Sequence, residues 1–101
     1  MKDFVKVAKK SELPEDTGTR VEINGREIAI FKVGEKVYAV DHICPHAGGP
    51  IAEGSLNLDM AMCPWHGWEF NVRTGECSFN SEIKLTCFEV REEGDDVYVK
   101  V

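Results

Sequence analysis

Several features that mark common protein classes are missing from this sequence, and each absence removes a class. No apolar run is long enough for a signal peptide or a membrane span, and charged residues are spread through the first ten positions. No glycine-rich nucleotide-binding loop is present, so the chain is not expected to be a reductase. Basic residues are outnumbered, with 12 Lys and Arg against 18 Asp and Glu, and the net charge of −6 repels nucleic-acid phosphates. We therefore expect a cytoplasmic protein that binds neither membranes nor nucleic acids.

Sustained helical periodicity is also missing, and apolar residues recur mostly at every second position, which is the period of a β-strand. The 101 residues fit one domain, so we expect a single domain over residues 1–101. Asn24-Gly25 is typical of a type I′ hairpin turn, and Ser11 is expected to cap a helical turn over residues 11–16. We expect an all-β sandwich or small barrel with strands over residues 4–8, 19–23, 26–32, 37–40, 58–62, 68–72, 85–91 and 97–101.

The four cysteines divide into two groups. Cys44 and Cys63 each lie close to a histidine, which favours metal binding over disulfide formation. Cys77 follows a turn and Cys87 lies in an alternating apolar stretch, so we expect a bystander and a buried thiol, respectively. A disulfide between these two is not expected in a reducing compartment. His42, the third histidine, is expected to make a local hydrogen bond rather than to bind metal.

Two segments escape the strand pattern and carry the chemistry. Residues 44–50 read CPHAGGP and residues 63–68 read CPWHGW, so each loop offers one thiolate and one imidazole. Sixteen residues separate His46 from Cys63. The four side chains Cys44, His46, Cys63 and His66 could hold zinc as a structural ion, or a 2Fe–2S cluster with two thiolates on one iron and two imidazoles on the other. Ligand identity alone does not decide between these two.

Both motifs and their spacing resemble the Rieske signature C-x-H…C-x-x-H, and the runs CPHAGGP and CPWHGWEFNVRTGE resemble Rieske ferredoxins over residues 37–76. The resemblance implies one 2Fe–2S cluster, with Cys44 and Cys63 on the inner iron and His46 and His66 on the outer iron. It also implies the Rieske fold, an antiparallel β-sandwich of three stacked sheets with a two-loop cluster-binding subdomain at about residues 42–72.

The sequence departs from the high-potential respiratory branch of this family at four positions. That branch joins its two loops by a disulfide, and the corresponding residues here are Gly49 and Trp65. It also places a Ser and a Tyr hydroxyl near the cluster, where this chain has Trp68 and Phe70. Without hydroxyl donors the oxidised cluster is favoured, so we expect a potential toward the lower end of the Rieske range of roughly −150 to +300 mV.

The resemblance implies an electron carrier rather than an enzyme. Rieske oxygenases have a second domain with a mononuclear iron site, which 101 residues do not accommodate beside this one. We therefore expect the chain to pass electrons from a flavin-dependent reductase to a terminal oxygenase. The alternative is the small subunit of an assimilatory nitrite reductase, which shares the domain but often lacks the cluster ligands. The acidic composition favours weak, salt-sensitive encounters with a partner.

Overall fold

The fold is that of an all-β protein. A computed structural model of the chain describes residues 3–44, 48–65 and 67–101, and within these residues eleven strands and two short 3₁₀ helices are found. Every strand pairing among them is antiparallel. The expected all-β, antiparallel architecture is therefore confirmed. No helix in the described part of the chain is long and apolar enough to cross a membrane.

The strands form two sheets. The larger sheet has six strands in the order β1-β11-β10-β4-β3-β2. Its members are β1 (Phe4–Lys9), β2 (Thr19–Ile23), β3 (Arg26–Val33), β4 (Lys36–Asp41), β10 (Cys87–Glu93) and β11 (Asp96–Lys100). The smaller sheet has five strands in the order β5-β6-β7-β8-β9. Its members are β5 (Leu56–Asn57), β6 (Met60–Met62), β7 (Glu69–Asn71), β8 (Glu76–Cys77) and β9 (Asn80–Lys84).

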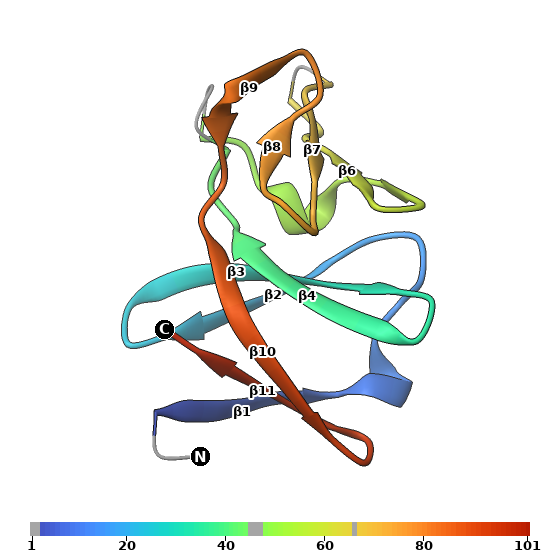
Figure 1. The fold of residues 1–101 in the computed structure, drawn as a ribbon, viewed down its shortest axis with the longest axis vertical. Coiled ribbons are helices and arrows are strands. Elements are labelled where there is room, and N and C mark those ends of the chain that lie inside the picture. Colours follow the sequence, from blue (N-terminus) through green and yellow to red (C-terminus); the bar gives the residue numbers. More distant parts are fainter. Residues whose placement is uncertain (1–2, 45–47, 66) are drawn as a thin grey trace.

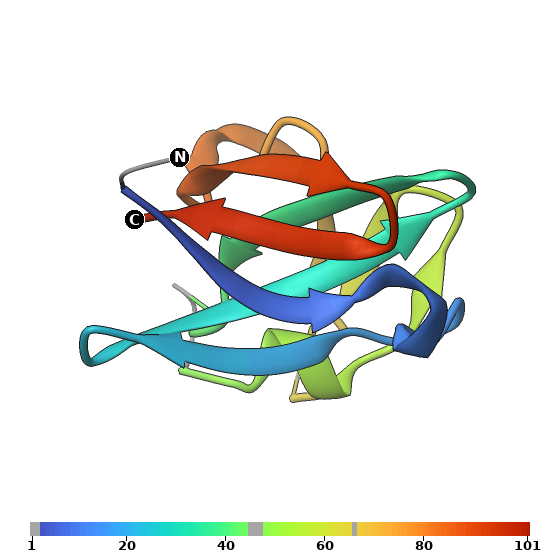
Figure 2. The ribbon, with the colours of Figure 1, turned by 90° about the horizontal axis from the view of Figure 1, so that it is seen from below.

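The larger sheet changes partner along β10 and so supplies two layers. Cys87 and Phe88 pair with β4, whereas residues 89–93 pair with β11. One buried cluster packs between the two halves of the sheet: Leu13, Ile23, Ile28, Ile30, Val37, Ala39, Val97 and Val99. With the smaller sheet above them, the elements form three stacked layers, which Figure 1 shows from the side; Figure 2 looks along the stack from below, with β1 and β11 nearest the viewer. This is the arrangement that the resemblance to Rieske proteins implies.

Strand β3 lies in the middle layer and is covered on both faces. Its residues Ile28, Ala29, Ile30 and Phe31 are all buried. Because neighbouring side chains of a strand point to opposite faces, Ile28 and Ile30 join the cluster between the two halves of the larger sheet. Ala29 and Phe31 join a second cluster under the smaller sheet. The unbroken apolar run of β3 therefore connects the scaffold to the layer that carries both cysteine loops.

The hairpin turn at Asn24-Gly25 is confirmed, since φ is +52° and +83° at these two residues, as a type I′ turn requires. The expected strand over residues 58–62 is wrong in its first half. Leu58 has a φ of +58° and is 82% exposed at the turn between β5 and β6. Its apolar side chain fits the alternating pattern of a strand, although the backbone reverses direction there.

Two other local predictions need correction. The helical turn is a 3₁₀ helix, η1 (Lys10–Glu12), and Ser11 does not cap it. Its N–H and hydroxyl groups instead donate to the carboxylate of Asp95, in the turn between β10 and β11. The strand expected from residue 85 begins at Cys87, because the N–H of Leu85 donates to the carbonyl of Gly75 before the larger sheet resumes.

Candidate metal centre

The first cysteine loop leaves the larger sheet just after β4. The carbonyl group of Cys44 accepts a hydrogen bond from the N–H of Gly48 at 2.8 Å, and the N–H of Cys44 donates to the carbonyl of Gly49 at 2.9 Å. Gly48 has a φ of +76°, a left-handed conformation that glycine adopts without steric cost. The chain therefore closes a compact loop on Cys44.

The second loop, between β6 and β7, repeats this pattern. The carbonyl of Cys63 accepts from the N–H of Gly67 at 3.1 Å, and the N–H of Cys63 donates to the carbonyl of Trp68 at 2.7 Å. Gly67 has a φ of +72° and holds the same position relative to its cysteine as Gly48 does. Each loop thus closes on its own cysteine through the same two backbone hydrogen bonds.

The two loops bring their thiols together. Cys44 and Cys63 are both 2% exposed, and their side chains are hydrogen-bonded to each other. Burial raises the pKa of the Cys63 thiol, a backbone hydrogen bond from Trp65 opposes the rise, and the contact with Cys44 adds to it. Two buried sulfur atoms in contact form half of the donor set of a soft-metal site.

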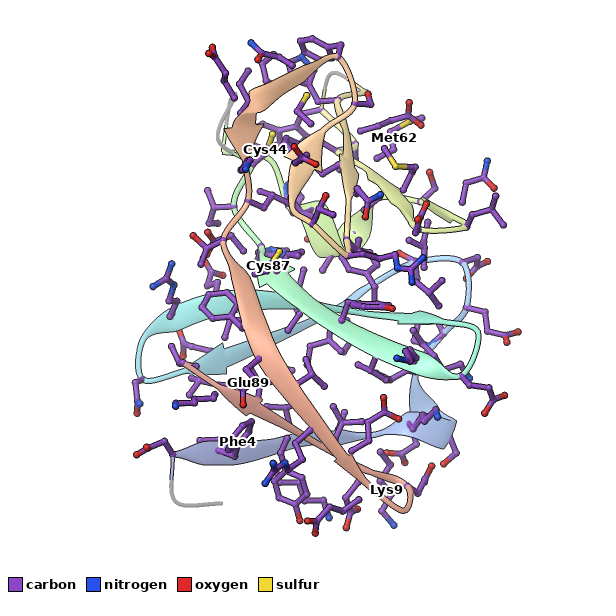
Figure 3. The ribbon with its side chains drawn as sticks, viewed as in Figure 1. Phe4, Lys9, Cys44, Met62, Cys87 and Glu89 are labelled. Carbon is purple, nitrogen blue, oxygen red and sulfur yellow. The ribbon has the colours of Figure 1, made fainter. Side chains whose placement is uncertain are left out.

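His46 and His66 lie outside the described residues, so the structure locates two of the four predicted site residues and brings those two together. In Figure 3, Cys44 lies in the upper part of the molecule among the side chains of the smaller sheet.

Gly49 and Trp65 face each other across the loops. A Cβ atom built on Gly49 would lie 3.3 Å from the Cβ of Trp65 and 2.6 Å from the Sγ of Cys63. The two positions at which the sequence comparison with the respiratory branch predicts the absence of a disulfide are therefore neighbours in space. The first loop passes directly over the sulfur of the second.

His42 fastens the first loop to the scaffold. Its side chain is 3% exposed, and Nδ1 accepts a hydrogen bond from the N–H of Ala52, in the 3₁₀ helix η2 (Ile51–Glu53), at 3.2 Å. Its carbonyl accepts from the N–H of Ile51 at 2.8 Å. Burial lowers the pKa of His42, which agrees with a neutral ring whose Nδ1 is an acceptor. The expected local hydrogen bond is confirmed.

Apolar side chains pack around the two thiols. Phe70 of β7 is fully buried in the same cluster as both cysteines, and half-buried Trp68 packs against that cluster. The ring of Trp68 in turn meets the edge of Phe79 with centroids 4.8 Å apart. Phe79 was not singled out by sequence reasoning, because no strands were expected over residues 76–84, and so no turn was expected between them.

The remaining two cysteines are free thiols, as expected. Cys77 is buried under the smaller sheet. Cys87 is exposed, so the prediction of a buried thiol is wrong. Its neighbour Phe88 packs against the cluster inside the larger sheet, and strand alternation turns Cys87 to the opposite face. Figure 3 shows Cys87 where β10 passes the end of β4.

Comparison with known proteins gives a consistent result. A family model described as the Rieske [2Fe-2S] domain matches residues 3–89. The chain is 35% identical to ferredoxin CarAc of Metapseudomonas resinovorans, over 95% of this chain and 92% of that protein. Among solved structures, a chain from a complex of reduced oxygenase and oxidised ferredoxin in carbazole 1,9a-dioxygenase matches with a TM-score of 0.87 and 34% identity, over 99% of this chain and 94% of that one.

A nitrite reductase small subunit also shares the fold. The structure from Mycobacterium tuberculosis, a putative NADH-dependent nitrite reductase small subunit, matches with a TM-score of 0.89 over 97% of this chain and 94% of that one. Its sequence identity is 18%, so this likeness concerns the fold alone.

Proposed function

Because this chain belongs to the Rieske [2Fe-2S] family, we propose that it carries single electrons from a flavin-dependent reductase to a terminal oxygenase. It is an electron-transfer component and not itself an enzyme. The observation that carries the proposal is the contact between the buried thiols of Cys44 and Cys63, each at the base of a closed loop.

Four side chains are proposed to hold the cluster. Cys44 and Cys63 would bind one iron as thiolates, and His46 and His66 would bind the other through neutral imidazoles. The donor chemistry fits, because two thiolates at contact distance match one iron, and each loop adds one imidazole. The chemistry that the cluster supplies at this site is the uptake and release of one electron.

The protein's own part is to hold these ligands and exclude water. Loop closure at Gly48 and Gly67 holds the two cysteines in place, which lowers the entropic cost of ordering these ligands. Phe70 and Trp68 supply an apolar layer without hydroxyl donors. Fewer donors to the cluster stabilise its more negative, reduced state less, which favours a low reduction potential.

Three further properties are proposed on sequence grounds. The chain acts in the cytoplasm, residues 1–101 form one domain, and residues 42–72 form its cluster-binding part. The net charge of −6 favours a partner surface of positive charge, and electron transfer should then slow as salt rises.

The test combines spectroscopy with electron transfer. Iron, sulfide and zinc are measured on the purified protein, and EPR spectra are recorded before and after dithionite. The reduced protein is then mixed with the oxygenase component of carbazole 1,9a-dioxygenase, and oxidation of the carrier is followed by absorbance. A silent sample that gains a Rieske signal and reduces the oxygenase supports the proposal. Zinc without iron would overturn the cluster assignment, and an intact cluster that reduces no oxygenase would overturn the carrier role.

A further inference from the structure

The turn between β8 and β9 presents an aromatic side chain to solvent. Phe79 is 63% exposed, although a phenyl ring is normally placed inside a protein. The turn lies at the same end of the molecule as the loop between β6 and β7 that holds Cys63 (Figure 1). Burying such an apolar ring against another surface is favourable, so it is a natural contact point for a partner.

Phe79 is held in a fixed position rather than on a free loop. Its ring makes an edge-to-face contact with Trp68, with an interplanar angle of 86°. The N–H of Ser78 donates to the carbonyl of Glu69 at 2.8 Å, which ties the turn to β7. The carbonyl of Trp68 accepts from the N–H of Cys63, so Phe79 is one side chain removed from the cysteine loop. A rigid anchor loses little entropy when a partner binds it.

The surroundings of Phe79 carry unpaired negative charge. Glu69 lies beside the turn through its hydrogen bond to Ser78, and Glu82 follows on β9, where its N–H donates to the side chain of Asn80. Across residues 3–44, 48–65 and 67–101, no Lys or Arg forms an ion pair with either carboxylate. An exposed aromatic ring on a turn with acidic residues on the adjoining strands matches a partner pocket that is apolar inside and edged by Arg or Lys.

We propose that Phe79 is a docking anchor, and that it inserts into an apolar, basic-rimmed pocket on the oxygenase component. This inference rests on the proposed carrier function and adds to it a specific contact residue. Docking there would hold the acceptor against the side of the molecule that carries the Cys63 loop, so the electron would cross a short distance. Glu69 and Glu82 would steer the encounter, while Phe79 would set how long the complex lasts.

The experiment compares three cluster-loaded variants with the wild type. Phe79→Ser removes the ring, and Phe79→Tyr keeps it. Leu58→Ser is the matched control, because Leu58 is an even more exposed apolar residue of the same sheet. It lies in the turn between β5 and β6, which projects to the side of the molecule in Figure 1. For each protein, the affinity for the carbazole oxygenase component is measured by calorimetry, together with the KM for the carrier, the reduction potential and reduction by the flavin reductase.

The expected result is a rise of about tenfold in Kd and KM for Phe79→Ser, the size typical of an interface anchor, with an unchanged potential and unchanged reduction by the reductase. Phe79→Tyr and Leu58→Ser should stay within about twofold of the wild type. An unchanged Kd in Phe79→Ser, or a loss explained by a shifted potential, would overturn the inference but leave the carrier function standing. A defect confined to the reductase step would overturn the assignment to the oxygenase. Failure of the wild type to reduce the oxygenase would instead count against the carrier function, and the inference would fall with it.

Discussion

Gly54 lies directly against the carbonyl group of Met62, so closely that a Cβ atom on Gly54 would overlap with that carbonyl oxygen. Gly54 ends the 3₁₀ helix η2, which follows the first cysteine loop, and Met62 immediately precedes Cys63 of the second. The N–H of Met62 also donates to the carbonyl of Ser55 at 2.9 Å. The distance between the two loops is therefore set by backbone contact and leaves no room for a side chain at residue 54.

Replacing Gly54 by alanine should push the two loops apart. Because the added methyl group meets backbone atoms, which cannot rotate away, overpacking should cost about 3 kcal/mol of the free energy of unfolding. Iron per chain should fall as well, since the thiols of Cys44 and Cys63 would no longer converge. Urea unfolding and iron analysis measure the two effects.

The control for this variant is Gly34→Ala, in an open turn. Gly34 has a φ of +61° and nothing near its Cβ position, so alanine there costs only the left-handed strain of about 1 kcal/mol. Its iron content should match the wild type. Wild-type stability and full iron in Gly54→Ala would show that the loop spacing does not depend on this contact.

Substitution of a cysteine inside the site and of one outside it should have opposite effects on iron content. Cys44→Ser and Cys63→Ser should each lose most of the bound iron, because a serine hydroxyl is a harder and far less acidic ligand than a thiol. Cys87→Ser, at an exposed position outside the site, should keep full iron and the wild-type absorption spectrum. Iron loss in Cys87→Ser, or retention in Cys44→Ser, would contradict the proposed ligand set.

Much of this fold could be predicted from local sequence alone. The two residues Asn24-Gly25 are enough to predict the turn, and the apolar residues of β3 are enough to predict a strand. The cysteine loops could also be identified as a site from the sequence, because the packing of a core rarely requires Cys, His, Pro and Gly at such short spacing. The prediction that the two loops bind one cluster together came from the family resemblance, because the sequence of either loop alone does not show it.

The parts that failed depend on contacts between distant segments. Strand β8 has two residues and β9 is mostly polar, so neither shows an alternating apolar pattern; β8 joins the smaller sheet by pairing with β7, and β9 by pairing with β8. Ser11 was assigned to a helix cap, although its partner Asp95 lies 84 residues away. The exposure of Cys87 follows from which face of β10 meets the inner cluster, and alternation alone does not say which face that is.

A hydroxyl introduced at Phe70 should raise the reduction potential. Phe70 is fully buried in the cluster of side chains that includes Cys44 and Cys63, and the corresponding residue in the respiratory branch is a tyrosine. A hydrogen bond to a charged acceptor is worth about 1.5–3 kcal/mol. With part of this free energy favouring the reduced cluster over the oxidised one, Phe70→Tyr should raise the potential by roughly 50–100 mV. Redox titration followed by EPR measures the change.

Phe79→Tyr adds the same hydroxyl at an exposed turn and serves as the control. Its potential should equal that of the wild type, because Phe79 is an exposed residue outside the buried cluster that contains Cys44 and Cys63. Equal shifts in Phe70→Tyr and Phe79→Tyr would mean that the effect does not come from a donor near the cluster.

The link between Ser11 and Asp95 should make part of the stability depend on pH. The Ser11 hydroxyl donates to the Asp95 carboxylate at 2.6 Å, and this hydrogen bond holds the pKa of Asp95 below its ordinary value of 3.8. Since the folded-state pKa is the lower one, the stabilisation is complete above pH 3.8 and is lost as pH falls through the folded-state value. Ser11→Ala should therefore lower the urea midpoint at pH 7, and the difference from wild type should shrink as the pH falls below 3.8 and through the folded-state pKa. In an Asp95→Asn background, Ser11→Ala should give a small difference that does not vary with pH. A difference that stays constant from pH 7 down to the most acidic pH at which the protein remains folded, in the wild-type background, would show that Ser11 acts through packing and not through the carboxylate.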